Sequence, residues 1–122
     1  MRFLLVFITL TLVSACHSFD TTEIIEPTDF QIQSVSFNLS KDVIPTNMVA
    51  QKVKDHQEFT LVGAKLKQGD QNFVALWLFN TLDSADIRSI NLKAEEFSRF
   101  PYLTAITARE EASNLTAFLK RD

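Results

Sequence analysis

The chain has 122 residues, with 12 Lys and Arg against 15 Asp and Glu, for a formal net charge of −3. This length corresponds to one domain, and an acidic balance without a run of basic residues argues against a nucleic-acid partner. A single cysteine excludes an intrachain disulfide, and two glycines are too few for a glycine-rich phosphate loop.

The first sixteen residues have the pattern of an export signal. Arg2 supplies a positive charge, Phe3 to Val13 is an apolar run interrupted by two threonines, and small residues precede Cys16. This order predicts a secretory signal peptide over residues 1–15. An apolar run of about 11 residues is shorter than the roughly 20 that span a bilayer, so a transmembrane helix is not expected.

The segment Leu12 to Cys16 resembles the lipobox of bacterial lipoproteins. The resemblance implies cleavage before Cys16, a diacylglyceryl group on its thiol, and an anchor in the lipid bilayer of the cell envelope. The residue after Cys16 is His17 and not Asp. By the same resemblance, this implies sorting to the outer membrane, facing the periplasm. Cleavage by ordinary signal peptidase would instead release a secreted protein. Lipidation better explains a lone cysteine at this position.

Residues 16–29 are expected to form the anchor and a flexible tether, and residues 30–122 a single globular domain. His17 to Asp29 contains four acidic residues and a proline, and its apolar residues show no sustained helical or strand spacing. Ile24 and Ile25 offer an alternative, since they could begin an edge strand.

Two elements are predicted before residue 55. From Phe30 to Leu39, apolar and polar residues alternate, but the apolar residues change from even to odd positions after Ile32. This predicts a strand with a bulge near Gln33 and Ser34. Pro45 suits the first turn of a helix, so a short helix is predicted over Pro45 to Lys54, with a loop as the alternative.

Glu58 to Lys67 and Asn72 to Leu82 are two apolar runs joined by a turn with Gly69 and Asp70, which predicts a β-hairpin. The run around Trp77 is apolar on both faces, as in a central strand covered on both sides, so Trp77 is expected to be buried. Gly63 predicts a bulge or a close approach against the Trp77 ring.

Alternation at Ile90, Leu92 and Ala94 predicts a further strand that ends near Ala94 and is followed by an irregular connection from Phe97 to Tyr102. The alternative places Ile87, Ile90, Ala94 and Phe97 on one side of a helix.

A helix is predicted over Ala108 to Lys120. Thr107 and Glu110 have capping-box spacing, and the apolar residues form one stripe, with Glu111 placed outside it. Together these elements predict an α+β fold, an antiparallel sheet of about four strands with the C-terminal helix packed on one face.

Residues that could carry catalysis or bind a metal are scattered. His56 lies between Asp55 and Glu58, but a solvated turn histidine is the preferred interpretation. The carboxylate pairs Glu95–Glu96 and Glu110–Glu111 are interpreted as solvated charges. No metal, no cofactor and no enzymatic activity are therefore expected.

One segment has the composition of a binding hot spot. Phe97, Arg99, Phe100 and Tyr102 place three aromatic rings and a guanidinium in an irregular stretch. These residues are candidate protein-binding residues, and the alternative is that the rings fill the space between sheet and helix.

The sequence thus favours a small membrane-anchored envelope lipoprotein that acts as a non-catalytic binding or assembly module for another envelope protein. The alternative is a periplasm-facing module that binds a small apolar ligand in a Phe-lined pocket.

Overall fold

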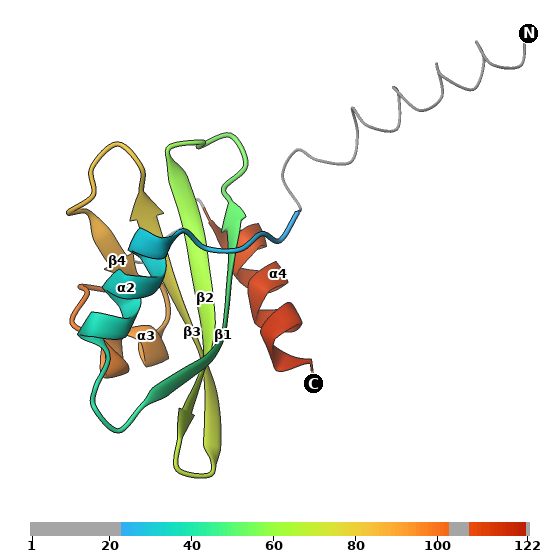
Figure 1. The fold of residues 1–122 in the computed structure, drawn as a ribbon. Helices are drawn as coiled ribbons and strands as arrows, with labels where there is room; N and C mark the ends of the chain where they lie inside the picture. The colour runs from blue at the N-terminus through green and yellow to red at the C-terminus, as the bar shows by residue number, and fades with distance from the viewer. Residues whose placement is uncertain (1–22, 103–107, 122) are drawn as a thin grey trace, which may run out of the picture.

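The computed structural model describes residues 23–102 and 108–121, and Figure 1 shows them as a sheet between helices. The strands β1 (Ile44–Lys52), β2 (Phe59–Gln68), β3 (Gln71–Asn80) and β4 (Ile87–Ser89) form an antiparallel sheet in the order β1-β2-β3-β4. Helices α2 (Asp29–Asn38) and α3 (Leu92–Phe97) cover one face, and α4 (Arg109–Lys120) covers the other. The predicted α+β class is confirmed, as is the C-terminal helix on one face.

The β2–β3 hairpin is confirmed. Gln68 pairs with Gln71, so the turn consists of Gly69 and Asp70, and Gly69 has a φ of 60°. A positive φ at the first of two turn residues is the geometry of a type II′ turn, which glycine adopts without a steric penalty.

Strand β3 is a central strand covered on both faces, as predicted. Trp77 is fully buried toward α2 and α3, while its neighbours Leu76 and Leu78 are buried toward α4. The alternation places two apolar sets on opposite faces because successive strand side chains point in opposite directions.

The strand predicted over residues 30–39 is wrong, because this segment forms α2. Thr28 Oγ1 accepts from the backbone N–H of Gln31, and Gln31 Oε1 accepts from the N–H of Thr28. This capping box satisfies two of the N–H groups at the helix start. Only Gln31 and Val35 are buried, and their spacing of four residues places them on one side of a helix.

The helix predicted over residues 45–54 is also wrong, because this segment forms β1 at the edge of the sheet. Val49 and Ala50 pack on opposite faces, which a strand allows. The register shifts between Pro45 and Asn47, and an edge strand tolerates a proline because its outer N–H needs no partner in the sheet.

The folded body begins before residue 30. Ile25 and Ala50 exchange two backbone hydrogen bonds of 2.8 Å, so Ile25 pairs with the outer edge of β1. The expected tether is therefore shorter than residues 16–29, and the alternative of edge pairing at Ile25 is correct. Residues 16–22 of that segment lie outside the described residues.

Strand β4 ends at Ser89, earlier than predicted, and the helical alternative is correct for Leu92–Phe97. Asn91 explains why the strand ends and a helix begins. Its Oδ1 accepts from the N–H groups of Ala94 and Leu76, and its Nδ2 donates to Val74 O. The Asn91 side chain thus caps α3. It also bonds to the backbone of β3 at Leu76 and Val74, in the place that a longer β4 would occupy.

Helix α4 is confirmed to within one residue, with Leu115 and Leu119 fully buried. Its N-cap is Ala108, without a side-chain cap, so Glu110 forms no capping box there; Thr107 lies outside the described residues. The close approach at Gly63 is to α4 and not to Trp77. A Cβ at Gly63 would lie 2.9 Å from Leu119 Cδ1 and 2.9 Å from Leu76 Cδ2. The alternative of a bulge at Gly63 is wrong, because Gly63 pairs in regular register with Val49 and Leu76.

Candidate functional site

The segment predicted as a hot spot divides between core and surface. Phe97 is buried, with its ring centroid 5.4 Å from that of Phe73, and Phe100 is half-buried against the same core. Arg99 and Tyr102 are exposed. Phe97 therefore belongs to the core on the face covered by α2 and α3 and does not lie between the sheet and α4, and the exposed candidates are Arg99 and Tyr102.

Buried hydroxyl groups hold this segment against the sheet. The Oγ of Ser89 donates to Phe100 O over 2.7 Å, and the indole Nε1 of Trp77 donates to Ser98 Oγ over 3.0 Å. The backbone N–H of Ser89 donates to Pro101 O. These bonds satisfy polar groups that would otherwise be costly to bury. Whether Arg99 and Tyr102 bind a protein stays a prediction.

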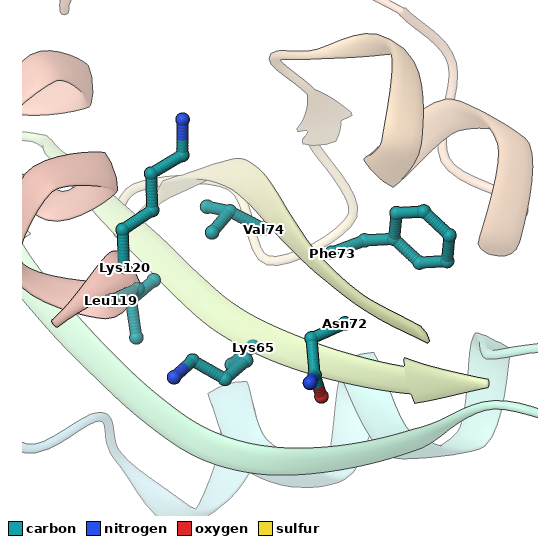
Figure 2. Close-up of a pocket in the computed structure, with 6 residues that line it drawn as sticks. All are labelled: Lys65, Asn72, Phe73, Val74, Leu119 and Lys120. Atoms are coloured by element: carbon teal, nitrogen blue, oxygen red, sulfur yellow. The ribbon is translucent and has the colours of Figure 1, made fainter. Parts of the chain in front are cut away.

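A second surface has a more definite shape. Figure 2 shows a hollow between the C-terminal end of α4 and strands β2 and β3, with a volume of about 210 Å³. Val74 and Leu119 provide apolar side chains to it, and Phe73 borders it with its ring turned away toward Phe97 on the other face of the sheet. The polar lining residues are Lys65, Asn72 and Lys120. We call these six residues the basic hollow.

Positive charges gather beside the basic hollow. Lys65 Nζ donates to the backbone carbonyl of Arg121 over 3.3 Å, which holds the end of α4 near the sheet. Lys67 projects from the same face of β2 as Lys65 because side chains alternate along a strand. Lys120 and Arg121 are exposed at the helix end. Four cations therefore lie on one side of a chain whose net charge is −3.

The sequence did not predict the basic hollow. Lys65 and Lys120 are far apart in the chain. They line the same hollow only because α4 packs across β2, with Leu119 over Gly63. The alternation of Lys65, Leu66 and Lys67 was the available signal, since it places two ammonium groups on the face opposite the buried Leu66.

The residues considered for metal binding or acid–base chemistry do not converge. Within residues 23–102 and 108–121, no three His, Cys, Asp or Glu side chains gather in a metal-binding group. His56 is half-buried in the β1–β2 connection, with its ring centroid 6.3 Å from that of Phe59.

Glu111 differs from the sequence prediction of a solvated charge. It is 3% exposed, and its Oε2 accepts from the backbone N–H of Lys54 over 2.9 Å. The next residue, Asp55, has a φ of 66°, a conformation that most side chains disfavour. Glu111 therefore ties α4 to the β1–β2 connection, while Glu110, Glu95 and Glu96 are exposed as predicted.

The chain was compared with known proteins, and no family model, curated protein or solved structure matches it. Among the helices of residues 23–102 and 108–121, none is both long and apolar enough to cross a membrane.

Proposed function

We propose that this chain is a bacterial envelope lipoprotein, anchored through acylated Cys16, whose body is a non-catalytic binding module. The observation that carries the proposal is the order of charge, apolar run and small residues that ends at Cys16. His17 at the next position supports the outer membrane, facing the periplasm, as the location.

We assign the docking role to the basic hollow. Lys65 and Lys120 stand beside an apolar lining formed by residues such as Leu119, so the surface suits an acidic segment with an apolar side chain. Complementary charge raises the rate of association and selects against other basic surfaces. The partner class is therefore an envelope protein with an exposed acidic segment.

The alternative, a small apolar ligand in a Phe-lined pocket, has less support. The basic hollow is smaller than the roughly 300–1,000 Å³ typical of ligand pockets, and of its lining only Phe73 is aromatic. Phe73 also packs its ring on the buried Phe97.

Cys16→Ser tests the anchor. We expect the variant to lose its acyl mass and to move from the membrane fraction to the soluble periplasmic fraction. Mass spectrometry and fractionation measure both. An unchanged mass and unchanged membrane partitioning would refute the lipoprotein assignment.

Charge reversal tests the basic hollow. In a pull-down from detergent-solubilised envelopes, Lys65→Glu with Lys120→Glu should weaken partner capture by about tenfold or more, since two favourable charge contacts become repulsive. Lys52→Glu is the matched control, because Lys52 is exposed on β1 outside the basic hollow. Capture should also fall as salt screens the exposed charges. Equal capture by the double variant and the control would exclude the basic hollow as the docking surface.

A further inference from the structure

Helix α2 presents apolar side chains to solvent on the side that faces away from the sheet. Phe37 is 87% exposed and Ile32 is 38% exposed. Phe30, which is 50% exposed, instead turns its ring toward the buried Phe79, with 6.2 Å between the ring centroids. Only Gln31 and Val35 of this helix are buried. Phe37 and Ile32 therefore leave apolar surface in solvent, whereas a helix on a globular surface usually turns its apolar side chains toward the core.

The outward face of α2 carries a single charge. The carboxylate of Asp29 is exposed one turn before Gln33, and the exposed residues between Ile32 and Phe37 are the uncharged Gln33 and Ser36. A shallow depression of about 280 Å³ runs between Ile32, Gln33, Ser36 and Phe37. The residues around this depression are uncharged, and the apolar side chains of Ile32 and Phe37 favour contact with hydrocarbon.

The position of Cys16 in the sequence indicates that the bilayer holding its acyl group lies near the folded body. Seven peptide steps separate Cys16 from Glu23, the first described residue, and they span at most about 25 Å when extended. The outer surface of a helix packed on a sheet lies on the order of 15 Å from the sheet. A bilayer that holds the lipid on Cys16 is thus within reach of the outward face of α2.

We infer that the outward face of α2, formed by Ile32 and Phe37 with Gln33 and Ser36 between them, docks on the lipid surface to which Cys16 is anchored. This inference rests on the lipoprotein assignment proposed above. A short tether keeps the face at a high effective concentration near the lipid, so a few apolar side chains are enough to bias the body's orientation.

This orientation has a consequence for the proposed docking site. Figure 1 shows α2 and α4 on opposite sides of the sheet, and the basic hollow lies at the end of α4. With α2 against the bilayer, the basic hollow faces away from the membrane, where an envelope protein can reach it.

A pair of fluorescent labels tests the orientation. Ser36→Cys places a thiol on the outward face of α2, and Ser113→Cys places one on the exposed side of α4. With Cys16 acylated, each introduced cysteine is the single free thiol of the chain. The lipidated proteins are labelled with bimane and reconstituted in phosphatidylcholine vesicles that carry a nitroxide on the acyl chains. We expect quenching at Ser36→Cys to exceed that at Ser113→Cys several-fold and to be insensitive to salt.

Substitutions at Phe37 show whether the apolar face causes the contact. Phe37→Glu should lower quenching of the label at position 36 to the level seen at position 113, and Phe37→Leu should retain it. Ala117→Glu adds the same charge on the exposed side of α4 and should change nothing. Phe37 is so exposed that its replacement should leave thermal melting unchanged.

Three kinds of result would overturn the inference. Equal quenching at both positions, or quenching indifferent to Phe37→Glu, would mean that α2 does not dock on lipid. Energy transfer between labels at position 36 of two copies, without lipid quenching, would mean that a second copy covers the face. Absence of an acyl group on Cys16 by mass spectrometry would refute the lipoprotein assignment itself, and the other two results leave that assignment standing.

Discussion

Helices α4 and α2 cover opposite faces of the same sheet, but they do so in different ways. Helix α4 buries Leu115 and Leu119 completely, and Gly63 leaves room for Leu119 against β2. Helix α2 buries Gln31 and Val35 and leaves Phe37 in solvent. One helix is therefore held by a periodic apolar stripe, and the other by its capping box and a small contact with the core.

The rest of the α2 face is filled by residues from the sheet and from α3. Trp77 is fully buried there, its indole N–H donates to Ser98, and Phe97 packs over Phe73. A face covered by short helices thus depends on large side chains from the sheet, whereas the α4 face depends on a close fit between helix and strand.

The largest loss of stability is expected at Trp77. Trp77→Ala removes a fully buried ring and should lower the free energy of unfolding by about 3–5 kcal/mol. Trp77→Phe keeps much of the apolar volume and should cost clearly less. Urea denaturation followed by far-UV circular dichroism measures both. Equal losses in the two variants would mean that the indole hydrogen bond to Ser98, not the ring volume, stabilises this face.

A smaller loss is expected from overpacking the α4 face. Gly63→Ala places a methyl group 2.9 Å from the Cδ atoms of Leu119 and Leu76, and should cost about 1–3 kcal/mol. In a Leu119→Ala background the penalty for Gly63→Ala should shrink, because one of the crowded atoms is gone. A double-mutant cycle measures this coupling. Additive losses would show that α4 shifts freely to admit the methyl group.

The capping box of α2 should contribute less. Thr28→Ala removes the oxygen that accepts from Gln31 and should cost about 1 kcal/mol. Thr28→Ser keeps a hydroxyl and serves as the control. Hydrogen exchange should show faster exchange in the first turn of α2 in Thr28→Ala, with the protection of α4 unchanged. Faster exchange across α4 as well would indicate that the two faces unfold together.

The smallest effect is expected at Asp86, in the β3–β4 connection outside both cores. The Arg88 guanidinium, 2.9 Å away, and the Asn80 amide donate to its carboxylate and lower the pKa of Asp86 below its usual range. The ionised group stabilises the fold above about pH 4, and this contribution is lost as pH falls through the lowered pKa. Because the pair is partly exposed, Asp86→Asn should cost no more than about 1 kcal/mol at neutral pH.

Stability measured against pH checks the sign for Asp86. The difference between the parent chain and Asp86→Asn should shrink as pH falls below about 4, since protonation removes the charge in the parent chain as well. A difference that stays constant over this range would mean that the carboxylate charge contributes nothing.

The elements that could be predicted have their signal within a few neighbouring residues. The β2–β3 hairpin follows from two apolar runs around Gly69, and α4 from a stripe that ends in Leu115 and Leu119. Trp77 is buried because the run around it is apolar on both faces. In each case the spacing of apolar residues within the segment is enough to predict the element.

The elements that were wrongly predicted depend on partners elsewhere in the chain. β1 is a strand because β2 offers it an edge to pair with, although Pro45 and Val49 fit a helix equally well. Asn91 ends β4 because its side chain bonds to the backbone of β3. Short segments with weak local preference adopt the structure that the neighbouring element requires.

The sequence by itself determined the hairpin, the C-terminal helix and the burial of Trp77, and the export signal that ends at Cys16 stays a prediction. Only the tertiary structure decided that Phe97 is core, that Glu111 is buried, and that Lys65 and Lys120 meet beside one hollow. Those outcomes depend on which segments pack across the sheet, because side chains far apart in sequence acquire a shared environment only when the backbone brings them together.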